Sequence, residues 1–290
     1  MSATVDVRAR RARFRRALQS WAQSSLREMP WRKRGRTGYE VMIAELLLKR
    51  TTAAAAARSY PGFLRRYPSI RELALASESD LVESFAPIGL QHQRARSVRA
   101  LAAHLIENED GEIPSDLGRL LAVPGIGVYS ARAVLSFAHD QPFAVVDSNV
   151  RRVLTRVFEG TLSPRATEPA LQEVADVLLP REGHALHNFA LLDLSAAVCR
   201  YQRPRCNVCP LARICDARSR FLDSRIAPRV PTELQRLRIQ MGLTLVELAA
   251  NTGLSKATIV SAEAGRTRPS AHTLRKLGEV LGSSRGRLQK

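Results

Sequence analysis

The chain has 290 residues and carries 45 Lys and Arg against 27 Asp and Glu, which gives a formal net charge of +18 at pH 7. An excess of this size favours a polyanionic partner, because cationic side chains that neutralise phosphates release bound counterions. Hydrophobic residues make up 45% of the chain, which argues against a disordered basic tail. No apolar run reaches the length of a membrane span, so the composition also excludes a membrane protein.

Apolar residues recur at three- and four-residue spacing over much of the chain, and this periodicity predicts helices. Strand-like alternation is rare, and turns rich in Gly and Pro separate the periodic segments. The sequence therefore predicts an all-α protein. The clearest periodic segments are 117–121, 131–137, 150–157 and 171–179.

Lysine is scarce in this basic chain, and most of the positive charge is arginine. Arginine binds phosphate through a planar guanidinium but cannot act as an amine nucleophile. Lys33 and Lys49 are followed by no lysine until Lys256. Any amine chemistry in the first 255 residues therefore depends on Lys33 or Lys49.

Glu45 is the only acid in the apolar segment 41–48. Burial raises the pKa of a carboxyl group, which makes a buried glutamate a candidate general acid or base. The alternative is a structural ion pair between Glu45 and an arginine.

The segment 121–131, LAVPGIGVYSA, predicts a helix end, a tight turn and a new helix that starts near Tyr129. Two glycines allow backbone N–H groups to approach a phosphate, and the N-terminus of the following helix favours an anion. We therefore expect Gly125, Gly127 and Val128 to bind a nucleic-acid backbone. Pro-Gly turns are also common as plain connections between helices.

Asp147 follows Tyr129 by eighteen residues, directly after a Val-Val pair and before an amphipathic segment. Aspartate is a good helix N-cap, so one interpretation of Asp147 is a cap without further function. The other interpretation is a carboxylate that acts in a site.

All four cysteines lie close together, with the spacing C-x6-C-x2-C-x5-C. Four thiolates at such spacing can hold one metal centre, either a [4Fe-4S] cluster or a zinc ion. Zinc sites usually present two C-x2-C pairs and this chain has one, so the spacing favours the cluster. The expected ligands are Cys199, Cys206, Cys209 and Cys215.

A change in composition after the last cysteine predicts a second module. Residues 218–231 contain two prolines and many charges, which is typical of a linker, and this predicts a linker at 218–230 between residues 1–217 and 231–290. In the second module, residues 244–264 have helix-turn-helix spacing, with Gly253 at the turn and Ser255 as the cap of the second helix.

The second module resembles the Cro and phage-repressor (XRE-type) helix-turn-helix family over about residues 232–281. It departs from that family at Leu245, where a polar phosphate contact is usual. The alternative is a small helical bundle for protein contacts, and dimerisation through this module is a further expectation. The expected DNA contacts are Ser255, Lys256, Thr258 and Ser261.

The hairpin, the motif VVDSNV and the cysteine spacing occur in an order that resembles the helix-hairpin-helix DNA glycosylase superfamily, which includes endonuclease III. The resemblance covers about residues 14–215 and implies a two-lobed helical fold with a [4Fe-4S] cluster loop. It also implies double-stranded DNA as the partner, with the target nucleotide flipped into a pocket, because the sugar–base bond is inaccessible inside a base stack. Further motifs that carry it are PWR (30–32), YEVMIAELLLKRTT (39–52), IGLQHQRA (88–95) and LLDLSA (191–196).

The resemblance assigns Asp147 to stabilisation of the positive sugar or activation of water, and Glu45 to acid–base catalysis. Tyr129 occupies the position where members that also cut the strand carry a nucleophilic lysine. The resemblance therefore implies a monofunctional glycosylase, with weak lyase activity through Lys49 as the remaining alternative.

Further DNA contacts are expected from the loop of Leu90, Gln91 and His92, which would enter the vacated stack, or else form an ordinary polar turn. Lys49 and Arg50, which follow the Glu45 segment, are also expected to contact DNA.

Two substrate classes fit a Glu and Asp pair without the lysine: thymine or uracil opposite guanine, and adenine opposite guanine or 8-oxoguanine. The motifs ELLLKRTT, IGLQHQRA and HNFALLDLSA are closer to prokaryotic thymine-DNA mismatch glycosylases, which favours the first class. A third hypothesis is a DNA-binding regulator that keeps the scaffold without catalysis. We expect a cytoplasmic, nucleoid-associated protein.

Overall fold

The computed structural model describes residues 3–162, 166–222, 233–263 and 269–282. These ranges contain helices and no strand, which confirms the predicted all-α class. The chain divides into two compact units, Met1–Leu222 and Asp223–Lys290. No helix within the described ranges is long and apolar enough to cross a membrane.

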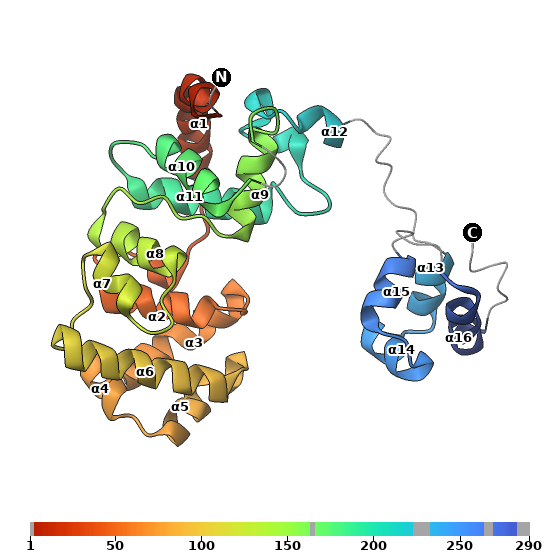
Figure 1. Ribbon diagram of the computed structural model, residues 1–290, viewed down its shortest axis with the longest axis horizontal. Helices are drawn as coiled ribbons and strands as arrows, with labels where there is room; N and C mark the ends of the chain where they lie inside the picture. The colour runs from red at the N-terminus through yellow and green to blue at the C-terminus, as the bar shows by residue number, and fades with distance from the viewer. Residues whose placement is uncertain (1–2, 163–165, 223–232, 264–268, 283–290) are drawn as a thin grey trace. The chain divides into compact units, whose positions relative to one another are not determined.

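The first lobe of the first unit is built from the middle of the chain (Figure 1). Its central helix α2 is buried along nearly its whole length, and it begins with a capping box in which Thr37 and Glu40 satisfy each other's backbone N–H. Around it the other helices enclose one hydrophobic core. The helices are α2 (Gly38–Leu48), α3 (Ala53–Arg66), α4 (Ile70–Leu75), α5 (Glu78–Phe85), α6 (Gln91–Glu109), α7 (Leu117–Ala122) and α8 (Val128–His139), with the short turns η1 (Pro30–Arg32) and η2 (Ala86–Ile88).

The second lobe joins α1 (Ala3–Ser25), at the start of the chain, to three helices that follow the first lobe in sequence. These are α9 (Ser148–Val157), α10 (Glu168–Leu178) and α11 (His184–Ala197). Figure 1 shows α1 beside α10 and α11. Val7, Phe14 and Leu18 share a buried core with residues from α9, α10 and α11. Arg15 strengthens the contact, since its Nε donates to the carbonyl of Leu178 at 2.9 Å.

The cysteine segment follows α11 with two short 3-10 turns, η3 (Cys206–Val208) and η4 (Ala212–Ile214), and then α12 (Arg218–Leu222). Residues 218–222 belong to the predicted linker, but here they form a helix of the first unit. Two contacts explain the difference: Arg156 lies over the Phe221 ring at 4.6 Å, and Arg220 pairs with Glu159 at 2.7 Å.

The second unit contains α13 (Glu233–Gln240), α14 (Leu245–Thr252), α15 (Lys256–Glu263) and α16 (Ala271–Leu281) around a small apolar core. Gly253 has a left-handed φ of +63°, which ends α14 and makes the turn to α15. Ser255 Oγ accepts from the Thr258 N–H at 3.1 Å, so the predicted cap of the second helix is confirmed.

Several sequence predictions fall outside the described residues. These are linker residues 223–230, the module start at 231–232, Ala264 at the end of the helix-turn-helix segment and the end of the chain from 283.

Candidate functional site

Glu45 lies on the buried part of α2 and is only 7% exposed. Burial, and to a smaller extent the nearby charge of Asp147, raise the pKa of its carboxyl to about 8, although Lys49 and Arg32 act to lower it. Glu45 forms no ion pair within the described ranges, so the alternative of a structural pair with an arginine finds no support there. A carboxyl with this pKa holds a proton at neutral pH.

Asp147 is the N-cap of α9, as the simpler interpretation predicted. Its Oδ1 accepts the backbone N–H of Asn149 at 2.9 Å and of Val150 at 2.6 Å. Capping does not remove Asp147 from the site, because its charge acts on both Glu45 and Tyr129. The cap fixes the orientation of the carboxylate.

Tyr129 is the third member of this group, in the first turn of α8. Burial raises the pKa of its hydroxyl well above 10, and the charges of Glu45 and Asp147 raise it further. The structure therefore brings together the three residues that the sequence singled out for catalysis, from α2, α8 and the start of α9.

The predicted hairpin lies between α7 and α8 and touches the end of α2. Gly125 has a φ of +81°, a conformation that favours glycine, and Lys49 Nζ donates to its carbonyl at 2.6 Å. Gly127 precedes α8 without a side-chain cap, so the first N–H groups of α8 have no capping partner. Val128 is 54% exposed, as expected for a residue that meets a ligand.

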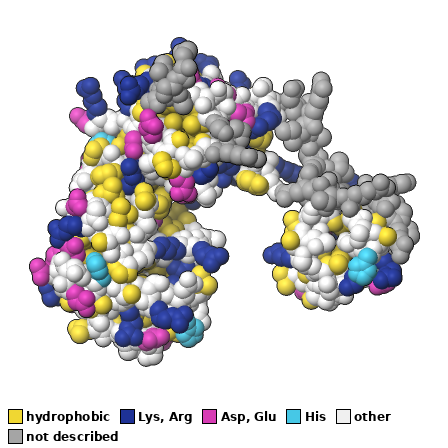
Figure 2. All heavy atoms as spheres, viewed as in Figure 1, with side chains coloured by type: hydrophobic (Ala, Val, Ile, Leu, Met, Phe, Trp, Pro, Cys, Tyr) yellow, Lys and Arg dark blue, Asp and Glu magenta, His cyan; other side chains and the backbone are white. Residues whose placement is uncertain are grey.

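The loop before α6 presents Leu90, which is 44% exposed and has a φ of +54°. Arg94 fixes this loop against α2, because its Nε donates to the carbonyl of Gly89 at 2.9 Å and its Nη1 to the carbonyl of Leu46 at 2.6 Å. Gln91 and His92 form the first turn of α6, and Arg50 also has a positive φ. Basic side chains lie over both lobes on the face drawn in Figure 2.

A buried ion pair joins the two lobes close to Glu45 and Asp147. Asp193 on α11 is fully buried, and its two oxygens accept from Arg32 at 2.7 and 2.9 Å. Arg27 adds bonds to the same carboxylate. Burial alone would raise the pKa of Asp193, but the hydrogen bonds from Arg32 and Arg27 lower it.

Asn149 and Arg152 connect Asp147 to the cysteine segment. The Asn149 side-chain amide donates to Asp147 Oδ2 at 3.0 Å, and Arg152 Nη1 donates to Asn149 Oδ1 at 2.8 Å. Arg152 Nε then donates to the carbonyl of Cys199 at 2.9 Å. These hydrogen bonds form one continuous chain from Asp147 to Cys199.

The four cysteines are free thiols, each partly buried. Burial and, to a smaller extent, the neighbouring thiols raise the pKa of Cys209 and of Cys215 to about 11, so the four groups lie within electrostatic range of one another. Arg156 Nη1 also donates to the Cys199 sulfur at 3.4 Å. Within the described ranges no three or more such side chains stand in a metal-binding arrangement. Four thiols beside a guanidinium are nevertheless a donor set that suits a soft metal centre.

In the second unit the predicted contact residues Ser255, Lys256 and Thr258 are exposed at the start of α15, and Ser261 lies further along it. Leu245, the departure from the repressor pattern, packs against the module core. Arg238 and Glu263 form a buried ion pair with a Nε–Oε1 distance of 2.6 Å.

Sequence reasoning assigned no role to Arg32, Arg94, Asn149, Arg152 or Asp193. One signal was available, because Asp193 is the only acid of its apolar helix, as Glu45 is in its own apolar segment. In the fold Asp193 pairs with two arginines, whereas Glu45 lies near another acid, Asp147. The sequence does not show which kind of partner each acid has.

The comparisons agree with this arrangement. Residues 43–176 match the model of the HhH-GPD superfamily base excision DNA repair proteins, and residues 234–288 match a helix-turn-helix model. A thymine/uracil-DNA glycosylase of Pyrobaculum aerophilum is 37% identical over 205 residues, which cover 69% of this chain and 89% of that protein.

An adenine DNA glycosylase of Mycobacterium tuberculosis is 36% identical over 197 residues, 67% of this chain. The match spans 64% of that relative's length, and 66% of the Mycolicibacterium smegmatis adenine DNA glycosylase.

Among solved structures, a thermostable thymine-DNA glycosylase superposes with a TM-score of 0.70 at 30% identity, covering 73% of this chain and 98% of that one. An endonuclease III–DNA complex shares the fold, with a TM-score of 0.63 at 24% identity over 72% of this chain and 97% of that chain. The first unit therefore belongs to the HhH-GPD superfamily of base excision DNA repair proteins.

Proposed function

We propose that the protein is a monofunctional DNA glycosylase that hydrolyses the bond between deoxyribose and a mismatched base, most favourably thymine or uracil opposite guanine. The observation that carries this proposal is the pairing of Glu45 and Asp147 at one site, with Tyr129 beside them. The two carboxyl groups have different environments, which allows one to hold a proton while the other carries a charge.

The reaction needs one protonated carboxyl group and one ionised carboxylate. The departing base develops negative charge, and the protonated Glu45 carboxyl, with its pKa of about 8, can donate to it directly or through water. The sugar develops positive charge, which the Asp147 carboxylate stabilises. Tyr129 cannot form a Schiff base, so the product is an abasic site in an uncut strand.

Lys49 is the one amine near this group, and its Nζ donates to the Gly125 carbonyl. Burial also lowers the pKa of Lys49, which would favour the neutral amine. We assign Lys49 to holding the hairpin against α2, and we expect at most weak lyase activity from it.

The surrounding surface suits duplex DNA. Gly125, Gly127 and Val128 present backbone N–H groups to one strand, and the exposed Leu90 is placed to enter the gap that the flipped base leaves. The helix-turn-helix module would add a second DNA contact through Ser255, Lys256, Thr258 and Ser261, and dimerisation through this module is part of the proposal.

Cys199, Cys206, Cys209 and Cys215 would hold a [4Fe-4S] cluster, with zinc as the alternative. When bound, such a centre would cross-link the segment that follows α11. Arg152 and Arg156 donate to the adjacent carbonyls of Cys199 and Arg200 at the start of that segment, so this part of the chain would brace α9 and Asp147.

The 37% identity to a thymine/uracil-DNA glycosylase supports the first substrate class, while the 36% identity to an adenine DNA glycosylase favours adenine opposite guanine or 8-oxoguanine as the second candidate. A cytoplasmic, nucleoid-associated location follows from the proposal.

The test incubates the full chain with T·G, U·G and A·8-oxoG duplexes and then treats them with alkali. We expect rapid strand breaks after alkali at T·G and U·G, slower breaks at A·8-oxoG, and none without alkali. Asp147→Asn should lower the rate by about 10²–10⁴-fold, although asparagine still caps α9.

Asp116→Asn is the matched control, because Asp116 caps α7 by the same type of bond outside the site. Equal cleavage by Asp147→Asn and wild type, or binding of all duplexes without cleavage, would overturn the proposal; the latter result would identify a DNA-binding regulator.

A further inference from the structure

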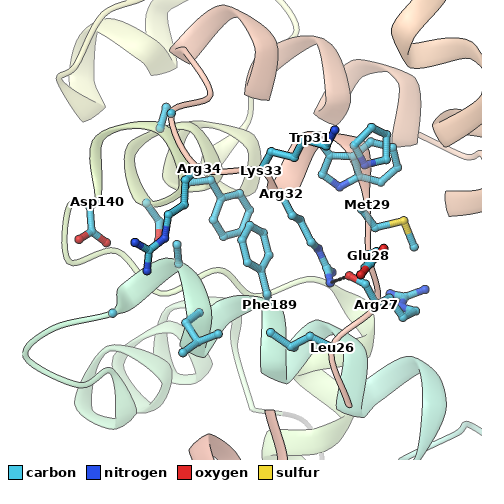
Figure 3. A pocket seen from close by; sticks show the side chains of 18 residues that line it. Leu26, Arg27, Glu28, Met29, Trp31, Arg32, Lys33, Arg34, Asp140 and Phe189 are labelled. Carbon is cyan, nitrogen blue, oxygen red and sulfur yellow. Dashed lines mark hydrogen bonds between the residues drawn. The ribbon is translucent and has the colours of Figure 1, made fainter. Parts of the chain in front are cut away.

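A separate groove of about 1170 Å³ opens in the first unit. It is lined by residues 26–35, by the C-terminal end of α8 together with Asp140, and by the first turns of α11 (Figure 3). Glu45, Tyr129 and Asp147 do not line it. Tyr129 precedes Phe137, which lines the groove, by eight residues of α8, or about 12 Å along the axis. The groove is therefore distinct from the site of the proposed reaction.

Flat groups stack along one wall of the groove. The Phe137 and Phe189 rings lie 4.3 Å apart at 26°, and the Arg32 guanidinium lies 4.6 Å from the Phe189 ring centre. Phe189 contacts both of the other groups, so Phe137 is one end of the stack, where it packs partly against the first-lobe core and partly lines the groove. A further aromatic ring in the groove would extend the stack from Phe137.

Unpaired positive charge lies at the rim. Lys33 and Arg34 are exposed and form no hydrogen bond or ion pair with other described residues. Figure 3 shows Arg34 on the same side of the pocket as Asp140. Glu28 and Asp140 are the acids of the rim, and Asp140 Oδ1 lies 3.6 Å from His184 Nδ1.

Backbone donors in the groove also lack an acceptor. α11 begins after Gly183 without a side-chain cap, so the N–H groups of its first turn are open to an anion, and Gly183, Ala185 and Leu186 line the groove.

From these features we propose that the groove is a nucleotide-binding site. The phosphate lies at the start of α11 beside Lys33 and Arg34, and the base stacks on Phe137. The same chemistry is present in a free nucleotide and in one nucleotide of a single DNA strand. An acidic peptide would use the cations but would leave the aromatic end of the stack without a partner.

The experiment measures binding to the full chain by calorimetry, so it does not depend on catalysis. The probes are dAMP, deoxyadenosine, inorganic phosphate, dTMP and hexathymidylate. We expect dAMP to bind at least about tenfold more tightly than deoxyadenosine or phosphate alone, since each of these lacks half of the recognised chemistry. Tighter binding of hexathymidylate than of dTMP would identify a strand as the source, and equal binding a free nucleotide.

Variants locate the site. Lys33→Ala/Arg34→Ala should weaken dAMP binding about tenfold, and Phe137→Leu should weaken it about fivefold or more, because leucine keeps the apolar volume and loses the ring. Arg58→Ala/Arg65→Ala removes the same charge from exposed positions on α3 and should change binding less than twofold. Asp147→Asn should bind dAMP like wild type, and Lys33→Ala/Arg34→Ala should still cleave a T·G duplex at the wild-type rate.

Three results would overturn the proposal. The first is no dAMP binding at millimolar concentration. The second is an equal loss of binding in the α3 control, which would reduce the effect to general charge. The third is tighter binding of an oligo-aspartate peptide than of dAMP, which would assign the groove to an acidic protein segment. Failure of the glycosylase assay leaves each of these measurements interpretable.

Discussion

Asn149 holds both oxygens of Asp147: its backbone N–H donates to Oδ1 at 2.9 Å and its side-chain amide donates to Oδ2 at 3.0 Å. Val150 binds Oδ1 as well, so Oδ1 keeps its cap bonds when the Asn149 side chain is removed. The side chain of Asn149 therefore positions Oδ2 while the backbone preserves the helix start.

Asn149→Ala should lower the single-turnover rate on a T·G duplex by about 10–100-fold, because displacement of a catalytic group by about 1 Å lowers the reaction rate by a factor of this size. The melting temperature should stay within a few degrees of wild type. Asn108→Ala is the control, since the Asn108 amide bonds only to His104 on the exposed side of α6. A wild-type rate in Asn149→Ala would show that Oδ2 is not used.

The pKa of Glu45, about 8, gives the reaction a pH dependence. The proton donor is present below this value, so the single-turnover rate should fall as pH rises through about 8. Glu45→Gln should be slower and lose this fall at alkaline pH. A wild-type rate that is constant from pH 6 to 9.5 would exclude Glu45 as the acid.

The same shift predicts a change in stability with pH. The pKa of Glu45 is raised on folding from 4.5, so the folded state binds its proton more tightly than the unfolded state does, and this contribution is lost as pH rises from about 4.5 to about 8. Glu45→Gln has no such proton. Its melting temperature relative to wild type should therefore be lowest near pH 4.5 and increase up to about pH 8, as thermal scans at both values would show.

Asp193 should matter for stability more than for chemistry. Asp193→Ala leaves the largely buried Arg32 without its carboxylate, and breaking a buried ion pair in this way destabilises a protein by about 3–5 kcal/mol. Urea unfolding measures the loss. Asp80→Ala is the control, because its pair with Arg66 is exposed and should contribute at most about 1 kcal/mol.

The cysteine segment can be tested by its colour and metal content. Protein purified without oxygen should be brown, with a broad visible absorbance and about four iron atoms per chain if all four thiolates hold one cluster. Cys209→Ser should lose the absorbance and lower the melting temperature. A colourless protein with one zinc per chain would show that the cysteines hold zinc and not a cluster.

The sequence predicted the helical class, and the three residues that it selected for catalysis, Glu45, Tyr129 and Asp147, lie within electrostatic range of one another in the structure. Asp147 shows why a local signal can support two interpretations, since its cap and its place beside Glu45 both occur in the structure. Residues 218–222 show the opposite case. Their composition is typical of a linker, but contacts of Arg156 and Glu159, about sixty residues earlier, hold them in a helix.

The supporting residues were beyond prediction because their partners are remote in sequence. Arg94 donates to the Leu46 carbonyl in the last turn of α2 and to the Gly89 carbonyl before α6, and the buried Asn188 binds the backbone of Val145 and Phe143 ahead of Asp147. No periodicity or motif encodes a bond between a side chain and a distant backbone group. Such bonds form only when the helices have packed together.

The packing of α1 against α10 and α11 affects the order in which the protein can fold during synthesis. The helices of the first lobe are complete once residue 139 has left the ribosome, whereas Arg15 waits for a carbonyl 163 positions later. Until then the apolar face of Val7, Phe14 and Leu18 lacks the native neighbours that α10 and α11 supply. The apolar face of α1 thus stays exposed during much of translation, and the nascent chain is then a substrate for chaperones that bind exposed hydrophobic helices.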